Sequence, residues 1–292
     1  MSNLVKTIAG QNFKNQNLQA DDVFVANEVK SLSQLTGLPT RNGLTRAVIS
    51  GGEIVNVVSN SYGHLPNEKY FTQVEEHLIN ADIQFVTRSI NRGNSLFAVD
   101  YILSDDNYTI NVKNGDDRIR PMLRFTNSYD GSCKTSGHFG FFREVCSNGL
   151  HVAHSKIGFS VKHKGDIAEI VLPEIKQLIG VFMDNEYYTL QRKFDALAAT
   201  PIPNIDKFVK ETAEQFGLFQ FEASAKNPSP SLNARMVKDI IIRESHMLQQ
   251  NANLWFGYNA FNEVLHDKLK KPFGAQREID SKLFEHLLAS AN

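Results

Sequence analysis

Residues 119–150 read IRPMLRFTNSYDGSCKTSGHFGFFREVCSNGL. Apolar and polar residues alternate at both ends of this stretch, as they do in a strand whose two faces have different surroundings. Between the two ends lies the polar segment Asn-Ser-Tyr-Asp-Gly-Ser at 127–132, which is rich in residues that favour turns. The stretch therefore predicts two antiparallel strands joined by a polar turn.

The same two-residue period extends over residues 83–161. Short apolar runs are separated there by turn clusters at 91–94, 105–107 and 113–116. Connections this short join antiparallel neighbours, whereas parallel strands need a long crossover. The sequence predicts an antiparallel β-meander.

Helical periodicity and turn signals flank the meander. Gly51-Gly52 lies between two β-branched runs and predicts a hairpin, and a helix is expected after Pro66. Apolar residues recur at helical spacing from Asp166 to Leu197, where an internal proline and glycine predict a kink or a break. Further helices are expected at 204–217, 231–251, 253–270 and 279–290, with 227–230 as a linker.

These patterns predict an α+β protein. We expect an antiparallel meander with a long covering helix and a C-terminal helical region. The predicted division of the chain is an N-terminal arm at 1–40, an α+β core at 41–200 and the C-terminal helical region at 201–292.

Composition sets broad limits on function. The 292 residues carry a net charge of −1, which gives no whole-chain case for nucleic acid or an anionic membrane. Residues 84–164 alone carry +4, so the middle third is mildly basic. No run reaches the roughly 18 apolar residues of a membrane span, and the first residues contain no apolar signal segment. With two cysteines, the expectation is a protein of the cytoplasm.

The basic middle third also carries aromatic residues, and this combination points to single-stranded nucleic acid. Such strands are held by cations along the backbone and by aromatic faces under the bases. Lys156, Lys162 and Lys164 lie beside the same strands. The predicted nucleic-acid-binding residues are Arg88, Arg92, Arg120, Arg124, Tyr129, Lys134, Phe139, Phe141 and Arg143.

Three kinds of catalytic site were weighed against this interpretation. Cys133, His138, Cys146 and His151 have looser spacing than common zinc modules, so they form a weak metal candidate. Neither thiol lies in a recognised nucleophile signature. The aspartates fall mostly in turn clusters, where their local hydrogen bonds are sufficient explanation. We therefore predict no cofactor and no catalytic residues, and the sequence leans away from an enzyme.

A helix near residues 253–270 carries the single tryptophan. Trp255, Phe256 and Tyr258 are expected either to pack in the core or to bind a partner protein or another copy of the chain. An interaction module of this kind is the alternative to DNA binding, and a metal-dependent enzyme is the third hypothesis.

The pieces 127–132 and 143–150 resemble an uncharacterised domain family carried by phages and plasmids, whose members are labelled only as phage/plasmid-like proteins. Val57-Val58-Ser59 with Tyr62, and the helix at 254–263, are similar to further segments of that family. The resemblance covers roughly residues 45–270. It implies a mobile-element setting, with a location in the host cytoplasm if a phage encodes the chain, and no settled reaction.

At the level of architecture alone, a helix, a meander and a long crossing helix resemble single-strand annealing recombinases of the RecT and Redβ type. Fold likeness does not fix function. The expectation from the residues and the resemblance together is an accessory protein that binds single-stranded DNA, to anneal or protect it in replication or recombination, as a homo-oligomer.

Overall fold

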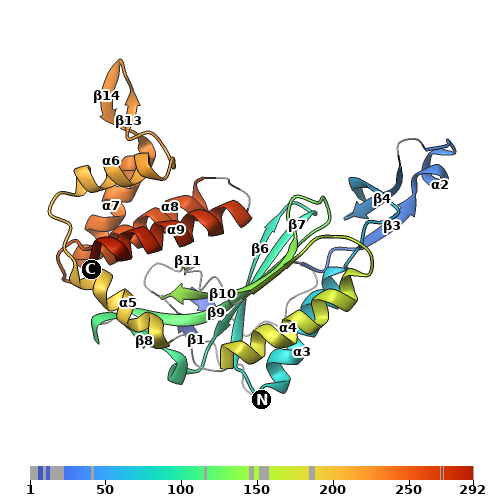
Figure 1. The fold of residues 1–292 in the computed structure, drawn as a ribbon, viewed down its shortest axis with the longest axis horizontal. Coiled ribbons are helices and arrows are strands. Elements are labelled where there is room, and N and C mark those ends of the chain that lie inside the picture. The colour runs from blue at the N-terminus through green and yellow to red at the C-terminus, as the bar shows by residue number, and fades with distance from the viewer. Residues whose placement is uncertain are drawn as a thin grey trace. The chain divides into compact units, whose positions relative to one another are not determined.

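The computed structural model describes residues 6–8, 11–13, 23–40, 43–114, 117–144, 148–150, 158–183, 188–269, 271 and 273–291. Helices and antiparallel sheets are both present, which confirms the predicted α+β class (Figure 1). The chain divides into two compact units. Unit 1 comprises Met1–Tyr108, Pro121–Gly140 and His154–Asn185, and unit 2 comprises Thr109–Arg120, Phe141–Ala153 and Glu186–Asn292. The domain division predicted from the sequence stays a prediction, with its regions at 1–40, 41–200 and 201–292.

The predicted meander is present as a seven-stranded sheet. Its main path runs in the order β11-β10-β9-β7-β6, with β12 paired to β10 and β8 paired to β9. Every strand pair whose register is given is antiparallel, and β9 and β10 contribute residues to both units. The strands are β6 (Phe85–Arg92), β7 (Leu96–Leu103), β8 (Ile110–Asn111), β9 (Arg118–Ser128), β10 (Thr135–Arg143), β11 (Asn148–Leu150) and β12 (Gly158–Val161), with 3-10 turns at Asp106–Tyr108 and Val112–Asn114.

A second sheet of three strands lies in unit 1, in the order β3-β4-β5. Gly51 and Gly52 both have positive φ, so the predicted hairpin between β4 (Leu44–Ser50) and β5 (Glu53–Ser59) is confirmed. Strand β3 (Asn27–Ser31) pairs with β4 although it falls in the expected arm. The short elements nearby are α2 (Leu32–Thr36) and a pair of strands, β1 (Lys6–Ile8) and β2 (Gln11–Phe13).

Two helices of unit 1, α3 (Asn67–Asn80) and α4 (Ile167–Met183), lie side by side (Figure 1). Helix α3 buries Tyr70, Phe71, Val74 and Leu78, the residues that recur at helical spacing, and the Tyr70 ring meets Phe125 of β9 edge to face at 6.1 Å. Helix α4 continues through its internal proline. The predicted long helix is two helices, because α4 ends at Met183 and α5 begins at Tyr188.

Unit 2 is mostly helical, as predicted for residues after 201. The predicted linker at 227–230 is instead β14, which pairs with β13 in a hairpin. Trp255 lies in the core of this unit, where its ring contacts Phe194 at 5.0 Å. The elements are α5 (Tyr188–Ala199), α6 (Ile205–Gln215), β13 (Glu222–Ser224), β14 (Asn227–Pro230), α7 (Leu232–Met247), α8 (Leu254–Asp267) and α9 (Phe273–Ala291). Among the described helices of both units, none is long and apolar enough to cross a membrane.

Candidate nucleic-acid interface

Two of the predicted phosphate-binding arginines pair with the same buried carboxylate. Arg88 of β6 and Arg124 of β9 are the register partners of Asp100 on β7. Each donates an Nη2 hydrogen bond to Asp100 Oδ2 at 2.7 Å. Burial alone would raise the pKa of Asp100, but the two guanidinium groups lower it to about 2. The carboxylate is therefore ionised, and it neutralises one of the two positive charges that the arginines supply.

Arg120 and Arg143 are paired in the same way in unit 2. Arg120 Nε donates to Glu144 Oε1 at 2.5 Å. The fully buried Arg143 reaches Asp117 Oδ2 at 2.6 Å and Glu244 Oε2 at 2.8 Å. We call Asp117, Arg143, Glu244 and Trp255 the buried ion cluster, because the Trp255 indole also donates to Asp117 Oδ2 at 2.7 Å.

The predicted stacking rings are also in the interior. Tyr129 and Phe141 are fully buried and Phe139 is 3% exposed. Strand alternation places Phe141 and Phe142 on opposite faces of β10, yet both are buried, so both faces of this strand are covered. Rings in these positions serve packing, as the edge-to-face contact between Phe141 and Phe194 at 5.2 Å shows.

These positions require a correction of the site residues. A guanidinium buried against a carboxylate cannot neutralise a phosphate without leaving a charge unpaired in a poorly solvated place. We therefore do not retain the buried Arg120, Arg124 and Arg143 as phosphate contacts, nor the three buried rings as stacking faces. The side chain of Arg88 is 25% exposed, and its hydrogen bonds to Asp100 hold it within the sheet. The side chain of Arg92 lies outside the described part of the chain. Lys134 is exposed and is retained.

Trp255, Phe256 and Tyr258, the residues predicted to bind a partner, are each at most 1% exposed. They pack within unit 2, where the Tyr258 ring meets Phe284 of α9 at 5.2 Å. Of the two expectations for this helix, its position in the core is the one observed.

Three exposed lysines gather around a groove of about 630 Å³ in unit 1. Lys134 follows the Asn127–Ser132 turn, and Lys162 and Lys164 follow β12. None of the three makes an ion pair with another residue in the described ranges. We call this the lysine groove; its lining includes Val57, Tyr62, Cys133, Lys134, Lys162, His163 and Lys164.

The polar turn of the opening stretch forms one wall of the groove. Asp130 accepts a hydrogen bond from the Ser132 N–H at 2.8 Å, and Gly131 has φ of +74°. Ser128 Oγ donates to the Cys133 carbonyl oxygen at 2.8 Å and so closes the turn. The turn residues therefore act structurally, and their effect is to present Lys134 at the groove.

A close backbone approach brings the other two lysines to the same place. The Gly165 N–H donates to the Ser61 carbonyl oxygen at 2.9 Å. A Cβ at Gly63 would lie 2.5 Å from the Gly165 carbonyl oxygen, so only glycine fits there. The Lys162–Lys164 segment is thus held against the segment that carries Tyr62.

A stacked ring pair lines the groove between the lysines. The Tyr62 and His163 rings lie 5.4 Å apart and are inclined by 13°. Burial, Asp130 and Cys133 raise the pKa of Tyr62 to about 12, so its hydroxyl stays protonated at neutral pH. The groove therefore combines cationic side chains with an aromatic platform.

The weak metal candidate gains no support from the residues that can be placed. Cys133 lines the groove, and burial raises the pKa of its thiol, so the thiol is protonated at neutral pH. His138 is buried on β10. Cys146 and His151 lie outside the residues whose side chains the structure describes. Within the described ranges, no three His, Cys, Asp or Glu side chains are grouped as metal ligands would be.

The comparisons with known proteins place the chain in a family. A family described as a domain of unknown function, DUF932, matches residues 54–284. The chain belongs to the DUF932 family. This match confirms that the sequence resembles an uncharacterised family, and it includes all of the lysine-groove residues named above.

Two curated relatives of this DUF932 chain are proteins of Escherichia coli (strain K12). The UPF0380 proteins YfjQ and YafZ are each 31% identical to it over 83 residues. The match covers 28% of this chain and 29% of either relative, so the chain spans under a third of the length of the curated relatives it matches. No solved structure matches the chain.

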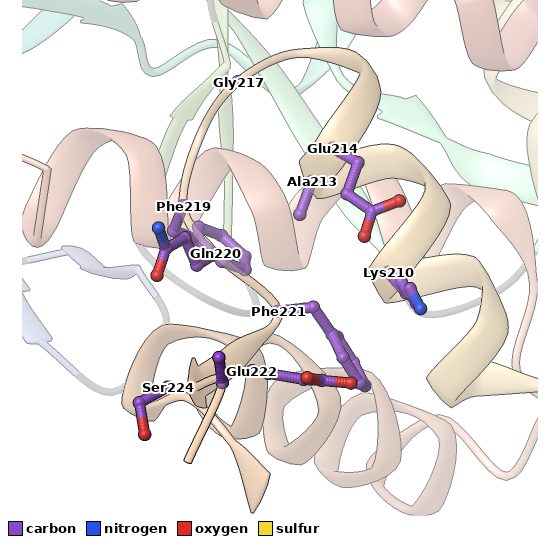
Figure 2. Close-up of a pocket in the computed structure, with 10 residues that line it drawn as sticks. Lys210, Ala213, Glu214, Gly217, Phe219, Gln220, Phe221, Glu222 and Ser224 are labelled. Carbon is purple, nitrogen blue, oxygen red and sulfur yellow. The ribbon is translucent and has the colours of Figure 1, made fainter. Parts of the chain in front are cut away.

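The DUF932 chain has a second cavity, of about 580 Å³, in unit 2. Figure 2 shows Lys210 and Glu214 on α6, with Phe219 and Phe221 on the segment that leads into β13. The Phe219 ring stacks on Phe261 at 5.9 Å. Acidic and basic side chains are mixed around this cavity, so it offers no cationic surface.

Sequence reasoning did not place Tyr62 and His163 of this DUF932 chain together in the lysine groove. Tyr62 lies some 70 residues before Lys134 and outside the meander. The run Lys162-His163-Lys164 was a usable signal, because three basic residues directly follow a strand. Nothing local in the sequence places that run beside Tyr62.

Proposed function

We propose that the protein binds single-stranded DNA in the lysine groove. The observation that carries this proposal is the gathering of Lys134, Lys162 and Lys164 around one groove without ion-pair partners among the described residues. Ammonium groups in this situation bind phosphates without first breaking an internal pair. The annealing or protecting role, the phage or plasmid setting that the resemblance implies, and a cytoplasmic location belong to the same proposal.

The ring pair supports a single strand over a duplex. Bases in a duplex are stacked on one another, whereas the bases of a single strand are free to stack on aromatic side chains. The Tyr62–His163 pair and the apolar Val57 and Val58 give such bases a surface beside the cations. Because every base has an aromatic face, we expect little sequence preference.

The test is a salt-dependent binding titration. Fluorescence anisotropy of a labelled oligothymidylate is measured with the wild type and with a Lys134→Ala, Lys162→Ala, Lys164→Ala variant. Single strands lose about 0.7 in the slope of log affinity against log salt for each phosphate contact removed, so the variant's slope is expected to fall by about 2.

A matched control removes the same charge elsewhere. Lys69, Lys176 and Lys226 are exposed and do not line the groove. Their triple alanine variant is expected to keep most of the wild-type slope. Equal losses in both variants would show nonspecific attraction to net charge, and no binding by the wild type at low salt would refute the proposal.

An interaction module remains the second candidate, because unit 2 carries an exposed hairpin. All described side chains of β13 and β14 are exposed, and an isolated two-stranded hairpin is only marginally stable in water. A second copy of the chain that covers it would provide the expected homo-oligomer. Self-association in sedimentation velocity, combined with no DNA binding, would favour this candidate.

A further inference from the structure

His163 has hydrogen-bond surroundings that a neutral ring satisfies at only one of its two nitrogens. Its Nδ1 lies 3.3 Å from the carbonyl oxygen of Gly63, which only accepts. Its Nε2 lies 3.4 Å from Thr135 Oγ. A neutral imidazole has one N–H and one lone pair, whereas the imidazolium has two N–H groups. The protonation state of His163 that fits therefore depends on whether the Thr135 hydroxyl presents its proton or a lone pair to Nε2.

A buried chain of hydrogen bonds fixes the direction of the Thr135 hydroxyl. Thr135 Oγ donates to Asn127 Oδ1 at 2.9 Å, and that oxygen can only accept. The amide nitrogen of Asn127 donates to Asn67 Oδ1 at 2.8 Å and to the Leu65 carbonyl oxygen at 2.9 Å. Asn127 therefore cannot be flipped without losing both of these bonds.

Each group in this series of hydrogen bonds donates to the next one, and the series ends at a backbone carbonyl oxygen. The amide nitrogen of Asn67 donates to the Val23 carbonyl oxygen at 2.8 Å. The side chains of Asn67, Asn127 and Thr135 are all fully buried, so water does not substitute for these partners. Since the Thr135 proton is used toward Asn127, Thr135 offers a lone pair to His163. Both ring nitrogens of His163 thus face acceptors.

We propose, building on the function proposed above, that His163 is a proton-linked cation of the lysine groove. It takes up a proton when a phosphate of the strand binds, and the imidazolium then donates to Gly63 and Thr135 from its two nitrogens. Protonation adds a positive charge to a groove that already holds three lysines. DNA binding consequently strengthens in mildly acidic solution.

The surroundings explain why this proton is absent in the free protein at neutral pH. Burial lowers the pKa of His163 below its ordinary value of 6.5, although the backbone oxygens of Gly63 and Cys133 and the carboxylate of Asp130 act in the opposite direction. A bound phosphate adds negative charge beside the ring and raises this pKa. Affinity therefore rises as pH falls through the pKa of the bound state, and levels off below that of the free state.

Neighbouring groups do not mask this dependence. Burial, His163 and Arg46 lower the pKa of His64 to about 4, so His64 is neutral above about pH 5.5. Tyr62 and Cys133 have raised pKa values and stay protonated there. The titratable and charged groups that face His163 or its neighbours are Arg46, Tyr62, His64, Asp130, Cys133, Lys134, Lys162 and Lys164.

The binding test uses oligothymidylate at about pH 8 and about pH 5.5 over a range of salt concentrations. The wild-type slope of log affinity against log salt is expected to steepen by up to about 0.7 at the lower pH, the value of one added contact. His163→Gln is expected to remove this difference. His77→Gln, on α3 and away from the groove, is expected to keep it.

A second measurement uses only the wild type, so it does not depend on whether the His163→Gln variant folds. The pKa of His163 in the wild type, followed by NMR of its ring protons, is expected to rise when oligothymidylate is added. DNA binding that is identical at both pH values, or an unmoved pKa of His163, would overturn the inference and leave the proposed function standing. Absence of binding at both pH values in low salt would refute both.

Discussion

The Asp100 carboxylate forms ion pairs with two arginines that the sequence alone suggested as phosphate contacts. It is fully buried and is held from both sides by Arg88 and Arg124 on the neighbouring strands. A charged pair on adjacent strands is a cross-strand contact that stabilises the sheet when it is satisfied and destabilises it when one partner is lost. Loss of the Asp100 carboxylate should therefore destabilise unit 1.

We expect Asp100→Asn to lower the free energy of unfolding by about 3–5 kcal/mol, because the buried Arg124 and the half-buried Arg88 lose their counter-ion. Urea titration at neutral pH measures this loss. Asp82→Asn is the control, since Asp82 is exposed and asparagine tolerates its positive φ. A loss under about 1 kcal/mol for Asp100→Asn would contradict the assigned pairing.

The same carboxylate predicts a pH dependence of stability. Because the pKa of Asp100 is lowered to about 2 from an ordinary 3.8, its contribution is complete only above about pH 5 and is lost as pH falls toward 2. The shift corresponds to about 2 kcal/mol. Asp100→Asn is expected to lack this part of the acid sensitivity.

At the scale of elements, the polar turn and helix α3 depend on each other. Helix α3 has no side-chain cap at Pro66, the residue before its first turn. Instead the N–H of Asn67 donates to the Tyr129 hydroxyl at 2.7 Å. A tyrosine of the turn thus satisfies a backbone donor that the helix geometry leaves without a partner.

Tyr129→Phe is expected to cost about 1–3 kcal/mol of unfolding free energy, because the buried Asn67 N–H loses its acceptor. Thermal and urea unfolding measure this cost. Tyr62→Phe provides a matched control, since the Tyr62 hydroxyl has no hydrogen-bond partner among the described residues. If the two substitutions cost the same, the Tyr129 hydroxyl does not support α3.

The elements themselves were largely predictable, and the exceptions have physical reasons. The Gly51-Gly52 hairpin, helix α3 and the meander follow from local periodicity and turn residues. Pro173 and Gly180 were expected to kink or break their helix, and α4 contains both residues without a break. Residues 227–230 contain two prolines and were expected to link helices, yet they form β14, a strand of an isolated hairpin where missing N–H groups are tolerated.

At the scale of the whole molecule, the two compact units each hold a buried ionic group. In unit 2 it is the buried ion cluster, in which Arg143 lies between Asp117 and Glu244. Burial raises the pKa of Glu244, although Arg143 counteracts this effect. Trp255, the single tryptophan of the chain, belongs to the cluster, so its fluorescence follows the state of unit 2.

Arg143→Met is expected to destabilise unit 2 by about 3–5 kcal/mol, because two buried carboxylates lose their cation. The measurement is urea unfolding followed by Trp255 fluorescence. Arg235→Met on α7 is the control, because that side chain is exposed. An unchanged unfolding midpoint for Arg143→Met would show that the cluster does not support the unit.

The sequence by itself determined the strands, the turn and most of the helices, because these depend on periodicity and turn chemistry among near neighbours. Only the tertiary structure decided which cations are available to a ligand. Strand register places Arg88 and Arg124 beside Asp100, and this pairing is invisible in either strand alone. The contact of Gly63 with Gly165 brings Lys162–Lys164 to Tyr62, which lies about 100 residues earlier in the chain. The sign of a side chain's charge is known from the sequence, whereas its neutralisation or exposure depends on contacts between residues that are distant in the chain.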